Sequence, residues 1–82
     1  MLIFITAEAQ KQYNKLQKSE QKKIKRKLIS LENYPYSGKK LSGELEEKYS
    51  LRVWPYRIIY KINKDLRKIE IESILHRQGV YK

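Results

Sequence analysis

Two arginines near the middle of the sequence are the residues best placed to do chemistry. If a two-residue turn at Trp54-Pro55 joins two strands, Val53 pairs with Tyr56 and Arg52 falls directly opposite Arg57. Like charges that face each other across a strand pair are destabilising, so folding alone gives no reason to keep them, whereas a bound polyanion would. Proline is disfavoured at the third position of a type I turn, so a longer loop and a cis peptide bond are the two alternatives to a regular turn.

The composition indicates that this polyanion is nucleic acid. Nineteen Lys and Arg against nine Asp and Glu give a net charge of +10 over 82 residues, and a domain this basic is expected to bind polyanions. A solvated surface would account for many of the lysines. All arginines except Arg26 lie between Arg52 and Arg77, and planar guanidinium groups suit phosphate better than ammonium groups do.

Length and residue types exclude several classes of protein. A chain of 82 residues predicts one domain, residues 1–82, with a modest core and no cofactor-sized cavity. The absence of cysteine excludes disulfides and thiolate metal sites and favours a reducing cytosol. Glu44, Glu46 and Glu47 lack a metal-binding spacing, and the apolar run from Met1 to Ile5 is too short for a signal peptide or membrane span. We expect a cytoplasmic protein with no metal, no cofactor and no membrane contact.

Two helices are predicted in the first half of the chain. Leu2 to Ile5 reads as a strand, and Thr6 can cap a helix that begins at Ala7. Ser19 can cap a second helix, which Tyr34-Pro35 ends. The apolar residues of this second helix recur at helical spacing: Ile24, Leu28 and Leu31. The two helices should form an antiparallel hairpin.

A small sheet is predicted in the second half. A turn-rich link over Pro35 to Gly43 precedes three strands, Tyr49 to Val53, Tyr56 to Ile62 and Lys68 to Leu75. Their alternation should bury one face, formed by Leu51, Val53, Ile58, Tyr60, Ile62, Ile69 and Ile71. The opposite face carries Ser50, Arg52, Arg57, Ile59 and Lys61. The expected fold is therefore of the α+β class, with the order β-α-α-β-β-β and the helical hairpin packed on one face of a mainly antiparallel sheet.

Three side chains could complete a reactive site beside the arginines. His76 is the only histidine, and an ordinary pKa of about 6.5 suits proton transfer near neutrality; a polar strand-end residue is the alternative. Tyr81 starts from a pKa of about 10 and would need neighbouring cations, and packing on the sheet edge is its alternative. Trp54 could stack on a base, with turn packing as the alternative.

The order of these elements, together with several short motifs, resembles the RelE/ParE superfamily of toxins from type II toxin–antitoxin systems. The motifs are Leu41-x-Gly43, Leu-Arg-Val, Tyr-Arg-Ile-Ile-Tyr and a terminal His-Arg-x-x-Val-Tyr. The resemblance covers essentially the whole chain. Val80-Tyr81 favours the RelE branch, whose members cleave mRNA in the ribosomal A site. The alternative is the ParE branch, whose members inhibit DNA gyrase, because Ile74-Leu75-His76 is an ending that such chains also show.

The resemblance implies a role for each residue of the site. Arg57 matches the arginine that RelE-type enzymes use on the scissile phosphate, and Arg52 matches a basic strand position used in the same way. Tyr81 matches the C-terminal tyrosine that stacks on the substrate base and assists proton transfer. Arg77 belongs to the terminal basic motif, although its spacing to Tyr81 is shorter than in some relatives. With His76, these residues form the expected catalytic set.

The remaining basic and polar residues are expected to bind RNA: Lys39, Lys40, Ser50, Trp54 and Lys61. Relatives often carry a lysine at the position of Ser50, and some place a carboxylate base where this chain has Lys39 and Lys40, so the proton acceptor stays open. Attack by the 2′-hydroxyl of RNA needs a proton acceptor, donors for the phosphoryl oxygens and an acid, but no metal. The expected partners are mRNA, the ribosome with its rRNA, and a cognate antitoxin in a hetero-oligomer. A noncatalytic RNA-binding module is a third possibility.

Overall fold

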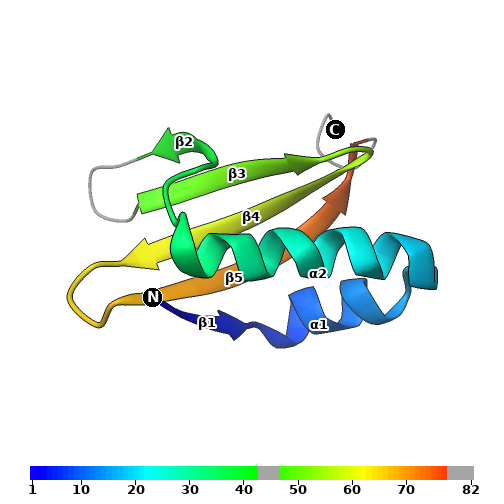
Figure 1. Cartoon of the computed structure of the whole chain (residues 1–82), viewed down its shortest axis with the longest axis horizontal. Helices are drawn as coiled ribbons and strands as arrows, with labels where there is room; N and C mark the ends of the chain where they lie inside the picture. The colour runs from blue at the N-terminus through cyan, green and yellow to red at the C-terminus, as the bar shows by residue number, and fades with distance from the viewer. Residues whose placement is uncertain (43–46, 78–82) are drawn as a thin grey trace.

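The described part of the chain, residues 1–42 and 47–77 of the computed structural model, folds as two helices packed on a five-stranded sheet (Figure 1). The elements in chain order are β1 (Leu2–Ile5), α1 (Ala7–Asn14), α2 (Lys18–Asn33), β2 (Lys39–Ser42), β3 (Glu47–Val53), β4 (Tyr56–Asn63) and β5 (Lys68–His76). The strand order across the sheet is β1-β5-β4-β3-β2. Only β1 and β5 are parallel, so the sheet is mainly antiparallel, and the expected α+β class is confirmed.

The sheet contains one strand more than the sequence pattern predicts. Lys39–Ser42, expected in a turn-rich link, forms β2 and pairs with β3 at the edge of the sheet. The prediction was wrong here because a short run of two lysines, a leucine and a serine has little intrinsic strand preference. Its ladder partners on β3 follow in the chain, and the pairing is irregular between Lys40 and Ser42.

The helix caps follow the prediction for α1 and depart from it for α2. The Thr6 hydroxyl oxygen accepts a hydrogen bond from the Ala9 N–H at 3.1 Å, as expected of an N-cap. Ser19, predicted to cap α2, lies inside the first turn, because the helix begins at Lys18 with Gln17 at the N-cap. Gln21 explains the earlier start: its backbone N–H bonds to the Gln17 carbonyl at 2.9 Å, and its side chain donates to the Tyr13 carbonyl at 2.9 Å.

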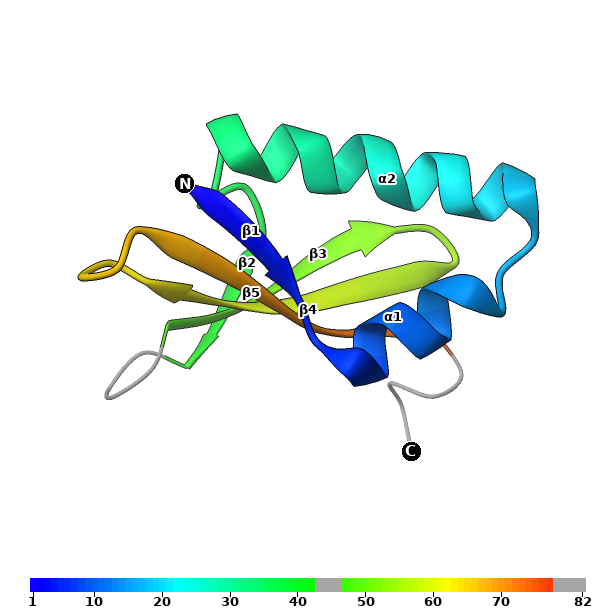
Figure 2. The ribbon, with the colours of Figure 1, turned by 90° about the horizontal axis from the view of Figure 1, so that it is seen from below.

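The core lies between α2 and one face of the sheet (Figure 2). The predicted helical stripe of Ile24, Leu28 and Leu31 is buried, while Ile29 on another side of α2 is 53% exposed. The predicted sheet face is buried as well, except that Leu51 is only partly buried. The centre of this face is Tyr60, which is fully buried and stacks on Tyr49 with ring centroids 5.4 Å apart. No helix in residues 1–42 and 47–77 is long and apolar enough to cross a membrane.

α1 protects the edge of β5 beyond the end of β1. β1 pairs with β5 only as far as Ile71, so beyond this residue the edge of β5 that faces away from β4 has no strand partner. Side chains at the start of α1 and within it bond to the backbone groups of this edge instead. The Thr6 hydroxyl donates to the Glu72 carbonyl at 3.0 Å, and the Ile74 N–H donates to Gln12 Oε1 at 2.6 Å. The backbone groups are thereby paired without a further strand, and α1 covers this part of the edge.

This contact predicts an unequal effect of two similar substitutions on α1. Gln12→Ala should lower the free energy of unfolding by about 1–2 kcal/mol, because the Ile74 N–H loses its partner in a partly buried setting. Gln10→Ala should change it by less than about 0.5 kcal/mol, since the Gln10 side chain bonds to Asn14 on the surface. Urea unfolding of both variants measures the difference, and equal midpoints would contradict this account of the edge.

Candidate functional site

The arginine pair lies where the strand register predicts it. Val53 pairs with Tyr56 and Arg52 with Arg57, and the Trp54-Pro55 bond of the turn is cis, one of the two predicted alternatives. Both arginines lie on the sheet face opposite α2, since their neighbours Val53 and Ile58 are buried on the other face. In the described part of the chain no carboxylate forms an ion pair with either guanidinium group. Two adjacent cations are therefore presented on one face without an internal anion.

Ser50 holds the guanidinium group of Arg57. Arg57 Nη1 donates to Ser50 Oγ at 3.3 Å, and Ser50 is only 5% exposed. Lys39 of β2 lies directly opposite Ser50 in the ladder, so it shares the face of the arginine pair. Lys40 pairs with Tyr49 and belongs to the other face. Of the predicted RNA-binding residues, Lys39 thus lies beside the arginines, Ser50 lies beneath Arg57, and Lys40 points away.

Arg77 and Trp54 meet at the turn that joins β3 and β4. The guanidinium carbon of Arg77 lies 4.9 Å from the centre of the Trp54 ring, and the Arg77 N–H donates to the Pro55 carbonyl at 2.8 Å. A guanidinium group over an indole face is a favourable cation–π arrangement. Trp54 is 58% exposed. The structure therefore brings these two predicted residues together at the end of the sheet that carries Arg52 and Arg57.

His76 lies on the other side of the sheet from the arginine pair. In the ladder between β4 and β5 it pairs with Tyr56, and the two rings meet edge to face at 5.4 Å. Leu75 pairs with Arg57, and successive residues of a strand point to opposite faces. The register thus separates His76 from the guanidinium groups with which the sequence grouped it. Tyr81, the other predicted proton carrier, lies outside the described residues.

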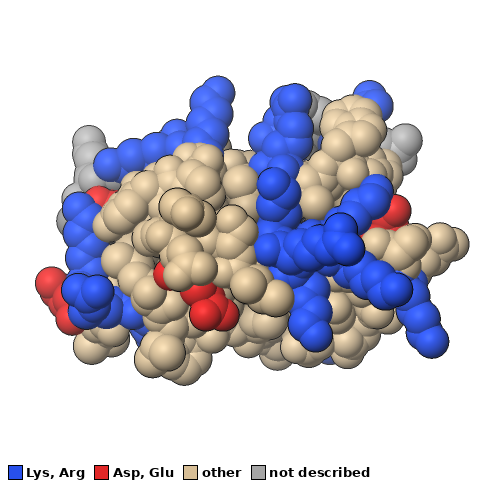
Figure 3. All heavy atoms as spheres, in the orientation of Figure 1, with Lys and Arg blue, Asp and Glu red and all other residues tan. Residues whose placement is uncertain are grey.

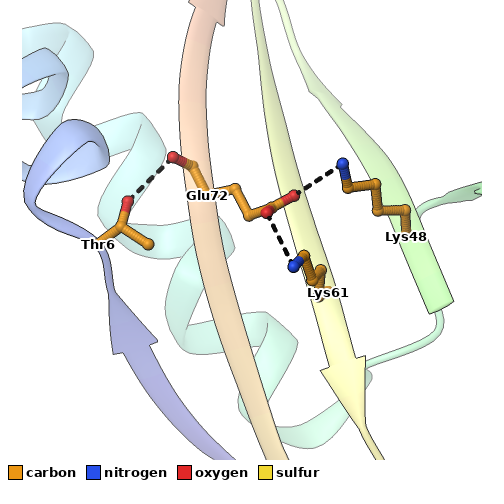
Figure 4. Close-up of polar contacts among 4 residues, drawn as sticks. All are labelled: Thr6, Lys48, Lys61 and Glu72. Atoms are coloured by element: carbon orange, nitrogen blue, oxygen red, sulfur yellow. Dashed lines mark hydrogen bonds and ion pairs between the residues drawn. The ribbon is translucent and has the colours of Figure 1, made fainter. Parts of the chain in front are cut away.

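An ion-pair network lies further along the same face as the arginines (Figure 4). Glu72 Oε1 is 3.4 Å from Lys48 Nζ, and Glu72 Oε2 is 3.3 Å from Lys61 Nζ. The ladder between β4 and β5 shifts register between Ile59 and Tyr60. Glu72 lies two residues after Glu70, the ladder partner of Lys61, so strand alternation places it on this face, and the bulge leaves it as the extra residue of β5. Lys61 was predicted to bind RNA, but the parts of Lys48 and Glu72 were missed, because their contact depends on how β3, β4 and β5 pair.

A further ion pair joins the start of β3 to the turn between β4 and β5. Lys64 Nζ lies 2.9 Å from Glu47 Oε1. The bond from Lys64 holds the pKa of the Glu47 carboxyl below its ordinary value, and the same bond raises the pKa of Lys64. The pKa of Glu47 is lower in the folded chain than in the unfolded chain. The pair therefore stabilises the fold at pH values above the pKa that Glu47 has in the unfolded chain, and this stabilisation is lost as the pH falls through the pKa of the folded chain.

The Glu47–Lys64 pair therefore predicts a pH-dependent effect. Glu47→Gln should lower the urea midpoint of unfolding slightly at pH 7, because the Lys64 side of the pair is exposed to solvent and such a pair contributes little. The difference from the unchanged chain should disappear in acid, at a pH below the lowered pKa of Glu47, where both chains carry an uncharged group. Urea titrations at pH 7 and in strong acid measure this, and a difference that persists in acid would refute it.

The arginine face suits phosphate chemistry by cations. Among residues 1–42 and 47–77 no group of three or more His, Asp or Glu side chains could hold a metal ion. The arginine face instead offers guanidinium donors from two neighbouring strands, with Lys39 beside them. Fixed donors of this kind stabilise negative charge that develops on phosphoryl oxygens.

The chain matches a known family over nearly its full length. The model of the family described as the ParE toxin of type II toxin–antitoxin system, parDE, matches residues 3–81. The chain belongs to this toxin family, and with it to the RelE/ParE superfamily that the sequence motifs resemble. No curated protein matches the sequence.

Solved structures show the same fold. The RelE–RelB complex from Pyrococcus horikoshii OT3 contains a chain with a TM-score of 0.85 and 24% identity, covering 93% of each chain. The toxin–antitoxin complex RelBE2 from Mycobacterium tuberculosis contains one with a TM-score of 0.81 and 26% identity, covering 93% of this chain and 96% of the other. The YoeB/ParE toxin from Agrobacterium tumefaciens has a TM-score of 0.76 at 17% identity, covering 93% and 98%. The match to the RelBE2 complex, at 26% identity, supports the RelE-like branch of the superfamily.

Proposed function

We propose that this type II toxin is an endoribonuclease that cleaves mRNA in the ribosomal A site and thereby inhibits translation. The observation that carries the proposal is the arginine pair: Arg52 and Arg57 face each other on a sheet face where, in the described residues, no carboxylate pairs with them. Such an arrangement is unfavourable for folding and favourable for a phosphate. The motif resemblance to RelE-type enzymes supports the same substrate.

Each arginine has a defined part in the proposed reaction. The 2′-hydroxyl of the substrate gives up its proton and attacks the adjacent phosphorus, while the bond from phosphorus to the 5′ oxygen of the next nucleotide breaks and that oxygen takes up a proton. Negative charge develops on the non-bridging oxygens as the bonds exchange. Arg57, oriented by Ser50, and Arg52 stabilise that charge, and loss of one such donor typically costs about 10²–10³ in rate. Ser50 acts as a positioning residue, because it is buried against Arg57.

The proton acceptor in this proposal is Tyr81. The resemblance assigns it both stacking on the substrate base and proton transfer, and cations near a phenol favour its ionised form. His76, on the opposite face by register, is the weaker candidate. Trp54 and Arg77 at the turn, together with Lys39 and Lys61, would bind the RNA on either side of the cleaved bond, and Lys40 would contact it only from the sheet edge.

A second candidate function is inhibition of DNA gyrase without RNA cleavage. Two observations favour it: the family model that matches the chain is that of the ParE toxin, and the register keeps His76 away from the arginine pair. In either case we propose that residues 1–82 form a single toxin domain that acts in the cytoplasm. Its partner would be a cognate antitoxin, as in the RelE–RelB complexes that share the fold.

Mapping of transcript ends separates the two functions. The toxin is induced in cells that carry a reporter message with its start codon and a matched message without it, and 5′ ends are mapped by primer extension. We expect new ends at codon-spaced positions on the translated message alone. Supercoiling by purified gyrase is measured in parallel. If both messages stay intact and supercoiling is blocked, the toxin is a gyrase inhibitor and not a ribonuclease. If both messages are cleaved, cleavage does not require translation by the ribosome.

A further inference from the structure

A second basic surface lies on α2, on the opposite side of the molecule from the arginine pair. Four cations follow the helix on the side away from the buried stripe: Lys18, Lys22, Lys25 and Arg26. All four are exposed, and their spacing of three and four residues places them on one face of the helix. Figure 3 shows Lys and Arg side chains gathered over α2, with few acidic side chains near them. We call these four residues the α2 stripe.

Folding alone does not explain the α2 stripe. Lys18 with Lys22, and Lys22 with Arg26, are like charges four residues apart, which destabilise a helix. Lys18 also lies in the first turn, where the helix dipole disfavours cations. The one ion pair along α2 in the described residues, between Glu20 and Lys23 at 3.3 Å, involves no member of the stripe. The charges therefore accumulate without internal compensation, as they do at the arginine pair.

We propose that the α2 stripe docks the sugar–phosphate backbone of a nucleic-acid duplex. The stripe offers cations, and no residue of α2 is an aromatic that could stack on a base. Contacts to the backbone without base stacking suit a duplex, whose bases are hidden. The 16-residue helix is a straight rod of about 24 Å, which matches a rigid polyanion better than a single strand. An acidic protein would need apolar contacts as well, and beside the stripe only Ile29 is an exposed aliphatic residue of α2.

The docking surface is separate from the proposed cleavage site and does not depend on it. The arginine pair and the α2 stripe lie on opposite sides of the sheet, so one protein could hold a duplex on α2 while a single strand meets the arginines. Loss of cleavage would leave duplex binding unchanged. Arg57→Ala is therefore expected to bind a duplex like the unchanged chain, whatever its activity.

A blunt RNA duplex of about 20 base pairs with a fluorescent label tests the proposal by anisotropy over a series of salt concentrations. Lys22→Gln/Arg26→Gln should weaken binding roughly tenfold at about 0.1 M salt and lower the slope of log K against log salt by about two. The control Lys11→Gln/Arg67→Gln removes the same charge from exposed positions on α1 and in the β4–β5 turn and should stay within about threefold. Lys22→Arg/Arg26→Lys keeps both charges and should bind normally.

Circular dichroism verifies that each variant is folded. Four outcomes would overturn the proposal, and the first is failure of the unchanged chain to bind the duplex. Equal losses of duplex affinity in the stripe variant and the control would show that only the net charge of the protein matters. If Arg52→Ala/Arg57→Ala is the one variant that loses duplex affinity, the duplex binds to the sheet face and not to α2. Normal duplex binding by the stripe variant, with weaker neutralisation by the antitoxin, would assign the stripe to a protein partner.

Discussion

Replacement of Arg57 or Arg52 by alanine is expected to lower mRNA cleavage by about two orders of magnitude or more while the protein stays folded. Each guanidinium group is a fixed donor for charge on the phosphoryl oxygens, and removal of one such donor costs about 10²–10³ in rate. Arg52→Ala should leave the free energy of unfolding unchanged or slightly higher, because it relieves the like-charge pair. Cleavage on programmed ribosomes and thermal unfolding are the two measurements.

The control for the arginine pair is Arg67→Ala, which removes the same charge in the turn between β4 and β5. It should retain cleavage within about twofold to threefold, since a distant exposed charge contributes only through the general field. Undiminished cleavage by the double variant Arg52→Ala/Arg57→Ala would rule out the arginine pair as the phosphate site. Toxicity that survives in this double variant, with gyrase inhibited, would favour the second candidate function.

Gly38→Ala is expected to lower the free energy of unfolding by about 1–3 kcal/mol, as overpacking of a filled site does. A Cβ at this position would lie 2.7 Å from the Tyr60 hydroxyl and 3.0 Å from the Ser50 carbonyl oxygen. Tyr60 cannot move away easily, because it is fully buried, donates to the Pro35 carbonyl at 2.9 Å and accepts from the Gly38 N–H at 3.0 Å. Burial also raises the pKa of Tyr60, as expected of a phenol kept neutral in the core.

A double-mutant cycle with Tyr60→Phe tests this explanation. Tyr60→Phe alone should cost about 1–3 kcal/mol, because the Pro35 carbonyl and the Gly38 N–H lose their partner. Gly38→Ala/Tyr60→Phe should cost less than the two changes summed, since the hydroxyl that meets the new Cβ is gone. Urea unfolding of all four chains gives the coupling, with Lys39→Ala as an exposed neighbour for comparison. Strictly additive losses would show that the hydroxyl is not the obstacle.

The sequence by itself determined the features that depend on local spacing. Ile24, Leu28 and Leu31 recur at helical spacing and are buried, and Thr6 stands one residue before α1 and caps it. The tight Trp54-Pro55 turn joins adjacent strands, so the register of Arg52 against Arg57 followed from counting residues outward from it. Strand alternation then placed both arginines on the face away from the core. These inferences hold because helical and strand periods act over a few residues and do not need the rest of the chain.

Only the tertiary structure decided which other side chains join the arginines. β2 exists because Lys39–Ser42 finds ladder partners on β3, and this pairing places Lys39 beside the arginine pair and covers Ser50. The pairing of β3, β4 and β5 brings Glu72 within reach of Lys48 on β3 and Lys61 on β4. The register of β5 sends His76 to the far face. Each of these outcomes depends on pairing between strands, and a shift of one residue in that pairing turns every side chain to the other face, which no local pattern records.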